Sequence, residues 1–197
     1  MAEPAKRGAT YADLEAVPPH LVGEIIDGEL VTHPRPAPKH GAASSALGMK
    51  LAEFQMGGGG PGGWLFIDEP ELHLGSDVVV PDIAGWRRER LTALPDTPYM
   101  ETAPDWVCEV ISPSTEAYDR GPKRRIYARA GIAHLWLLDP RLKLLETFAL
   151  TGGNWTLLGD FSGEDAVSAP PFDAITFSLG VLWPLDAPAD TPPSDNT

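Results

Sequence analysis

The apolar positions near the start of the chain predict a short helix followed by a β-hairpin. Thr10 precedes the run YADLEAV, with acids in the first turn, and this pattern is typical of a capped helix that ends at the two prolines that follow. Two apolar runs flank Asp27-Gly28, a preferred two-residue turn, so residues 21–33 are expected to form a hairpin.

A longer helix is expected over residues 38–54. Its apolar residues recur at i, i+4, i+8 and i+11, which gives the helix one buried face. That face consists of Ala43, Leu47, Leu51 and Phe54. His40 lies on the same face, near the helix start. The glycine-rich run at 57–63 cannot hold a regular element and predicts a flexible loop.

Strands dominate the rest of the pattern. They are expected at residues 64–70, 71–74, 77–86, 106–111, 134–139, 142–150 and 154–160. A helix over residues 116–130 interrupts them, and Pro122 inside its pattern predicts a later start or a kink. The expected class is therefore α/β or α+β, with one central mixed sheet, flanking helices and antiparallel hairpins.

Length and composition fit one globular domain. Of the 197 residues, 43% are apolar, enough for a single sizeable core. The expected organisation is a flexible arm over residues 1–9, one domain over 10–185 and a disordered acidic tail over 186–197, where Pro and Asp are frequent and Lys and Arg are absent.

The sequence also indicates a compartment. No apolar run approaches the roughly 18–20 residues of a membrane span, and the N-terminus lacks the apolar core of a secretory signal. The single cysteine, Cys108, excludes an internal disulfide framework. We therefore expect a cytoplasmic protein with no membrane partner.

The charge balance weakens a nucleic-acid hypothesis without removing it. The net charge of −13 argues against broad attraction to phosphate, which draws on Lys and Arg. Five cations nevertheless fall within ten residues: Arg120, Lys123, Arg124, Arg125 and Arg129. The four arginines are candidates for phosphate contact, with a solvated helix face as the alternative. Motifs for nucleotide cradles, zinc proteases and serine hydrolases are absent from the sequence.

Two acids interrupt otherwise apolar strands. Strand alternation places Asp82 in a row with valines and an alanine, and Glu109 in a row between Val107 and Ile111. An isolated buried carboxylate is costly to ionise. Either each acid has its own cationic partner, or the two converge on a divalent metal ion, which offsets both charges at once.

The helix after Glu109 supplies a cation. Lys123 lies at helical spacing from Ile126 and Tyr127, on the side expected to face the sheet, with Asp119 one turn before it. Two carboxylates and a lysine are the groups that metal-assisted phosphodiester hydrolysis needs: the acids hold the metal, and the lysine acts on the water or the phosphate.

At these residues the sequence resembles a known family. The segments PDIAG, CEVISPST and DRGPKRRIYARAGIAHLWLLDP, with EIIDGELV upstream, resemble the Uma2 group of the PD-(D/E)xK nuclease superfamily over roughly residues 10–185. The resemblance implies a restriction-endonuclease-like core and a site that uses Mg²⁺ or Mn²⁺ to cut DNA. One departure is His134, where the family usually carries an acid.

The resemblance also assigns roles. Asp82 matches the first acid of the motif and Glu109 the second, and both would bind the metal. The usual lysine position falls on Ile111, and Lys123 matches the lysine that this group carries on the next helix. Glu24 matches an additional acid, a third candidate ligand, and His40 matches a histidine that opens the long helix, a candidate catalytic residue. From its position one turn before Lys123, Asp119 is expected to hold that lysine, with a helix cap as the alternative; Tyr127 is expected to support the site from behind these residues or to be an ordinary core residue.

Ordinary interpretations stay open at this point. Asp82 could cap a turn, Glu109 could pair with an arginine, and Lys123 could form a surface pair with Asp119 of small worth. At the level of function, the alternatives to a DNA endonuclease are a non-catalytic binding or assembly module with the same fold, and a hydrolase of another phosphate substrate. An endonuclease that cuts both strands would favour a two-fold homodimer.

Overall fold

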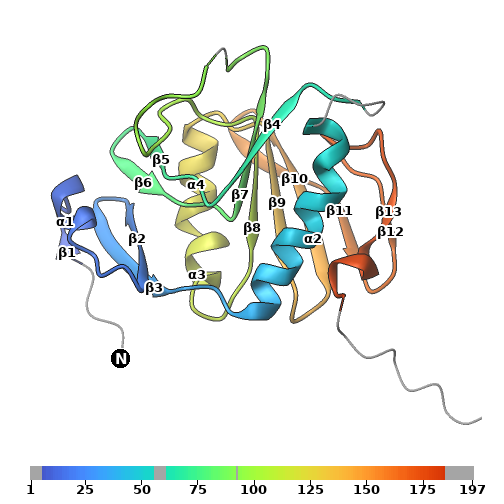
Figure 1. The fold of residues 1–197 in the computed structure, drawn as a ribbon, viewed down its shortest axis with the longest axis horizontal. Helices are drawn as coiled ribbons and strands as arrows, with labels where there is room; N and C mark the ends of the chain where they lie inside the picture. Colours follow the sequence, from blue (N-terminus) through green and yellow to red (C-terminus); the bar gives the residue numbers. More distant parts are fainter. Residues whose placement is uncertain (1–5, 56–60, 92, 185–197) are drawn as a thin grey trace, which may run out of the picture.

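A six-stranded mixed sheet forms the centre of the computed structural model, which describes residues 6–55, 61–91 and 93–184 (Figure 1). In spatial order its strands are β11 (Asn154–Ser162), β10 (Leu144–Thr151), β9 (His134–Asp139), β8 (Trp106–Val110), β7 (Ile83–Arg87) and β4 (Trp64–Asp68). β8 and β9 run parallel, and the other neighbours are antiparallel. A parallel pair needs a crossover, which the helical segment between β8 and β9 supplies.

Helices cover the two faces of this sheet (Figure 1). On one face α2 (Pro38–Gln55) buries the apolar positions that the sequence indicated, together with Ala46, against Cys108 and Val110 of β8. On the other face α3 (Glu116–Asp119) and α4 (Pro122–Arg129) follow β8, and Ile126 packs with Val107. The predicted α/β class with a central mixed sheet is confirmed.

A second sheet lies beside the first. Its strands, in order, are β1 (Lys6–Arg7), β3 (Glu29–Pro34), β2 (Leu21–Ile26), β6 (Asp77–Val79) and β5 (Leu72–Leu74). The predicted hairpin joins β2 to β3 through Asp27 and Gly28, whose φ values of 50° and 79° fit a type I′ turn. The short helix α1 (Tyr11–Glu15) begins after Thr10, whose main-chain N–H donates to Asp13 at 3.0 Å.

The prediction of one continuous strand over residues 77–86 is wrong. The chain leaves the second sheet after β6 and enters the central sheet at β7, with Val80, Pro81 and Asp82 between them. Pro81 has no N–H to donate to a strand partner, which favours a break at this point. Asp82 therefore lies at the crossing between the sheets and not in a row of strand residues.

The predicted kink in the helix after β8 is confirmed. The helix divides into α3 and α4 at Gly121, with Pro122 as the first residue of α4. A Cβ atom on Gly121 would lie 2.6 Å from the carbonyl oxygen of Ala117, so the break accommodates only glycine without a shift of the main chain.

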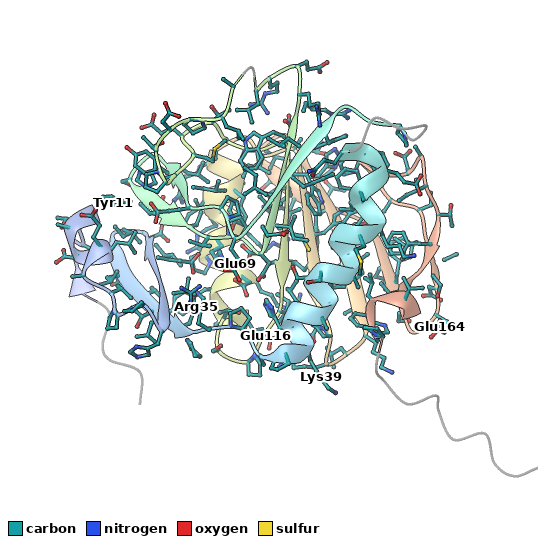
Figure 2. All side chains as sticks on the ribbon, in the orientation of Figure 1. Tyr11, Arg35, Lys39, Glu69, Glu116 and Glu164 are labelled. Atoms are coloured by element: carbon teal, nitrogen blue, oxygen red, sulfur yellow. The ribbon has the colours of Figure 1, made fainter. Side chains whose placement is uncertain are left out.

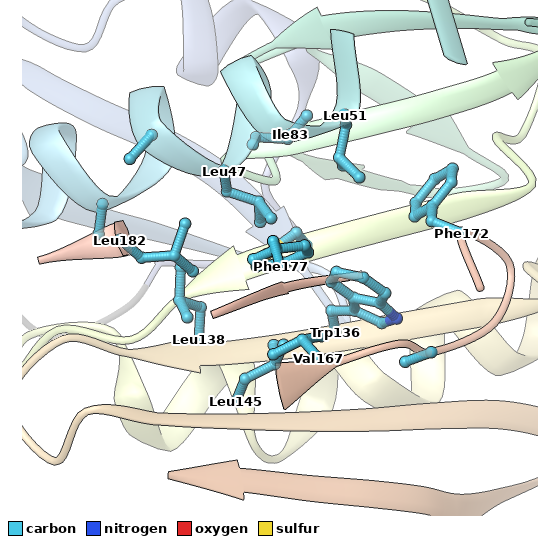
Figure 3. Packing of buried hydrophobic residues seen from close by; sticks show 14 of the residues in the cluster. Leu47, Leu51, Ile83, Trp136, Leu138, Leu145, Val167, Phe172, Phe177 and Leu182 are labelled. Atoms are coloured by element: carbon cyan, nitrogen blue, oxygen red, sulfur yellow. The ribbon is translucent and has the colours of Figure 1, made fainter. Parts of the chain in front are cut away.

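The C-terminal part of the described chain closes the core beneath α2. It contains β12 (Ala166–Val167), β13 (Phe177–Ser178) and the 3-10 helix η1 (Leu179–Leu182), none of which was predicted from the sequence. Figure 3 shows Val167, Phe172, Phe177 and Leu182 packed with Leu47 and Trp136.

Three predictions fall wholly or mostly on residues that the structure does not describe. The acidic tail at 186–197 and most of the glycine run at 57–63 lie there. So does most of the N-terminal arm, although Lys6 and Arg7 at its end pair with β3. None of the helices in the described ranges has the length and apolar character that crossing a membrane requires.

Candidate active site

A cavity of about 160 Å³ opens where β8 ends. Its walls come from the connection between β3 and α2, from the crossing between β6 and β7, and from the loop after β8. The ionisable residues in its lining are His33, Arg35, His40, Asp82, Glu109, Asp119 and Lys123. Figure 2 labels Arg35, which marks the wall formed by the β3–α2 connection. We refer to this space as the site cavity.

Lys123 is the centre of the charged groups. It is 2% exposed, and its Nζ lies 2.8 Å from Glu109 Oε1, 3.0 Å from Glu24 Oε1 and 3.4 Å from Asp119 Oδ1. Burial alone would lower the pKa of this ammonium, but Glu109 and Glu24 raise that pKa well above its usual value. The two glutamates therefore favour the protonated, positively charged form of Lys123.

Glu109 projects from β8 toward α4. It is 1% exposed, and it accepts a hydrogen bond from the hydroxyl of Tyr127 as well as the ion pair from Lys123. Burial raises the pKa of Glu109 well above the usual value, and Lys123 opposes this effect. A second positive charge nearby would further stabilise the ionised form of Glu109.

Asp82 and His40 form the opposite wall. Asp82 Oδ2 accepts from the main-chain N–H of Val110 at 2.6 Å, which ties Asp82 to the strand that carries Glu109. Asp82 Oδ1 lies 3.2 Å from His40 Nε2. Burial alone would lower the pKa of His40, but the contact with Asp82 raises it overall. The Nδ1 atom of His40 is buried and has no hydrogen-bond partner among the described residues.

Glu24 holds Lys123 rather than facing Asp82. Its Oε1 accepts from the main-chain N–H of Val80 at 2.8 Å and pairs with Lys123, and its Oε2 lies 3.4 Å from His33 Nε2. Burial alone would raise the pKa of Glu24, but Lys123 and His33 bring it down to about 2. Both oxygens are thus engaged, and Glu24 is not among the residues that line the site cavity in the described chain.

Asp119 lies one helical turn before Lys123. It is buried, and burial raises its pKa, with Lys123 acting in the opposite direction. Its Oδ1 has an ion-pair contact with Lys123 but no hydrogen-bond partner in the described ranges. Three buried carboxylates, on Glu24, Glu109 and Asp119, therefore surround one ammonium group.

The lining residues fit a divalent metal ion. Asp82 and Glu109 both present oxygen atoms, which Mg²⁺ and Mn²⁺ prefer, and the buried carboxylates outnumber the buried cation. Across the described residues no three His, Cys, Asp or Glu side chains are arranged as a metal-binding group. Two carboxylates suffice for Mg²⁺, which commonly binds through one or two of them and fills its remaining positions with water and substrate phosphate.

The four predicted phosphate-binding arginines lie away from the site cavity, outside its described lining. Arg125 and Arg129 pair with Asp27 at 3.2 and 3.1 Å, and Arg129 also with Asp77 at 3.0 Å. Arg120 pairs with Glu116 and Glu146, and the Arg124 guanidinium stacks 4.5 Å from the ring centroid of Phe148.

Arg35 is the arginine that the sequence reasoning missed. It lies in the segment PRPA, residues 34–37, between the predicted hairpin and the predicted helix, and no periodic pattern marked it. The available signal was the alternation of prolines, which favours an extended backbone in this connection.

The chain matches the structure titled as a "putative nuclease belonging to DUF820" from Anabaena variabilis, with a TM-score of 0.72, 20% identity, and coverage of 89% of this chain and 98% of that chain. At this identity the match shows that the two chains share a fold. No curated protein matches the chain. The family model Uma2, described as "Putative restriction endonuclease", matches residues 9–181, and the chain therefore belongs to the Uma2 family.

Proposed function

We propose that this protein is an endonuclease that uses Mg²⁺ or Mn²⁺ to hydrolyse phosphodiester bonds in DNA. The family and the fold support a nuclease. The observation that carries the finer proposal is the meeting of Asp82, Glu109 and Lys123 in one cavity, although they come from three separate segments of the chain.

The metal ion would be held by Asp82 and Glu109. When bound, it would lower the pKa of a coordinated water and offset negative charge on the phosphate. Glu24, the third ligand that the resemblance suggested, is better assigned as an anchor of Lys123, because it pairs with Lys123 and does not line the described part of the site cavity.

Lys123 would act as a charge and not as a base. Its pKa is raised, so it stays protonated at neutral pH and would orient the attacking water or stabilise the developing charge on the phosphate. Glu24 and Asp119 fix its position, and Tyr127 fixes Glu109. His40 would hold Asp82 through their contact at 3.2 Å.

A non-catalytic binding or assembly module is the second candidate. The net charge of −13 and the pairing of Arg125 and Arg129 with the protein's own acids favour it, because both reduce the attraction of this surface for DNA. The two candidates differ in one respect: in an endonuclease the buried charged residues take part in catalysis, and in a binding module they do not.

A plasmid-nicking assay with Mn²⁺ separates the candidates. The wild-type protein should convert supercoiled plasmid to open circles, with 5′-phosphate ends, and Glu109→Ala and Lys123→Ala should each lose this activity by at least about a hundredfold. Arg90→Ala is the control, since Arg90 pairs with Asp105 away from the site cavity. Equal nicking by all four proteins would remove the site assignment. Linear product at early times would support a two-fold dimer.

A further inference from the structure

Arg35 is placed to meet a substrate. It lies between Pro34 and Pro36 on the connection that forms one wall of the site cavity, and its side chain is 56% exposed. The other cation in the described lining, Lys123, is buried and surrounded by three carboxylates. Arg35 is thus the positive group at this cavity that a ligand arriving from solvent can contact first.

The present partners of Arg35 hold it weakly. One guanidinium nitrogen donates to the carbonyl oxygen of Pro19 at 3.3 Å, and another lies 3.7 Å from Glu69 Oε2. Such exposed ion pairs contribute little. A phosphate group offers a guanidinium two parallel hydrogen bonds to charged oxygens, which is the stronger arrangement. A phosphodiester at the site cavity could therefore replace Glu69 as the partner.

Glu69 is itself tied to the site. Its main-chain N–H donates to the carbonyl oxygen of Asp82 at 3.0 Å, and its φ of 46° is unusual for a residue other than glycine. Glu69 also lines a neighbouring hollow together with His40 and Asp82. The residue that pairs with Arg35 is therefore joined through its main chain to Asp82, which we assign to the metal ion.

We propose that Arg35 binds a phosphate of the substrate backbone next to the bond that is cut, and that Glu69 holds Arg35 in the free protein and competes with that phosphate. This inference rests on the proposed function, because it needs a phosphodiester in the site cavity. Arg35, on the β3–α2 connection, is then the phosphate contact that we propose, in place of the four arginines predicted from the sequence: Arg120, Arg124, Arg125 and Arg129.

Binding of a labelled DNA duplex, measured by fluorescence anisotropy with Ca²⁺ in place of Mg²⁺, tests the inference. Arg35→Ala should weaken binding by about tenfold or more, because it removes a charge-assisted pair of hydrogen bonds. The slope of log affinity against log salt should become shallower by about one. The affinity of Arg35→Lys should lie between those of the wild type and Arg35→Ala, because lysine keeps the positive charge but cannot form the two parallel hydrogen bonds of a guanidinium.

Glu69→Gln should bind several-fold more tightly than the wild type. This gain should vanish in the Arg35→Ala background if Glu69 acts through Arg35. The matched control is Arg90→Ala: Arg90 is 47% exposed and has, like Arg35, one carboxylate partner and one carbonyl partner. It should change the affinity by less than about twofold, as expected for a position outside the interface.

The two proposals fail in different ways. If the wild type binds and nicks DNA while Arg35→Ala binds as tightly as Arg90→Ala, the role of Arg35 is refuted and the nuclease assignment stands. If the wild type neither binds nor nicks DNA, both are refuted. A Glu69→Gln protein with weaker binding than the wild type would refute the competition between Glu69 and the phosphate.

Discussion

The two faces of the central sheet have different chemistry, although they share the same strands. On β8, Cys108 faces the core beneath α2, whereas its neighbour Glu109 faces α4 and the site cavity. Beneath α2, Phe172 makes ring contacts that include three tryptophans: Trp64, Trp106 and Trp136. We call this cluster the aromatic core. Around Glu109 the buried groups are instead charged.

The aromatic core stabilises the fold, whereas the buried charges on the other face do not contribute to stability in the same way. The aromatic core buries large apolar surfaces with complementary ring geometry, which favours folding. The charged side places three buried carboxylates around one ammonium group, and a buried charge in excess is unfavourable. Packing alone does not explain that arrangement, and the divalent cation that we propose would offset the excess negative charge.

The largest stability loss should come from the aromatic core. Phe172→Ala is expected to lower the free energy of unfolding by about 4 kcal/mol, because a buried ring is replaced by a cavity. Urea denaturation measures this loss. The stabilisation that Mn²⁺ provides should persist in the variant, and its disappearance would show that the two sides are not separable.

A somewhat smaller loss is expected from the charged side. Lys123→Ala should cost about 3 kcal/mol, because it leaves Glu24, Glu109 and Asp119 without their cation. The same denaturation experiment, with Arg90→Ala as the control, measures it. A change below about 0.5 kcal/mol, the range of ordinary surface substitutions, would mean that Lys123 does not hold the acids together.

Glu109→Gln should have the smallest effect and the opposite sign. In metal-free protein at pH 7 it is expected to stabilise the fold by about 1 kcal/mol, because burial disfavours the charged form of Glu109 and a neutral amide avoids that cost, while Lys123 keeps Glu24 and Asp119. Nicking activity should nevertheless be lost. A Glu109→Gln protein that is less stable than the wild type and fully active would contradict the claim that Glu109 serves activity at the expense of stability.

Much of the fold follows from local patterns in the sequence. The buried face of α2 follows from apolar residues at helical spacing, and the β2–β3 hairpin from a preferred turn at Asp27-Gly28. The break before α4 follows from Pro122, which cannot continue the hydrogen bonds of a helix. Each of these signals lies within a few residues of the element that it determines.

The remaining features depend on contacts between distant residues. Asp82 was expected in a strand row because both faces of its segment are apolar, and only the transfer of the chain between two sheets shows that it lies at a crossing. The pairing of Arg125 with Asp27 joins residues far apart in the chain. Arg35 lies between two elements, so no period could mark it. The proposed roles of Asp82, Glu109 and Lys123 stay predictions until they are measured.

Thermal unfolding at increasing Mn²⁺ concentration tests the central claim most directly. If Asp82 and Glu109 bind a divalent ion, the wild type should gain about 2.7 kcal/mol at a metal concentration one hundred times the dissociation constant. Asp82→Ala should lose that gain, while Arg90→Ala should keep it. Equal metal-dependent gains in Asp82→Ala and the wild type, or no gain in either, would contradict the assignment of this cavity to a metal-dependent reaction.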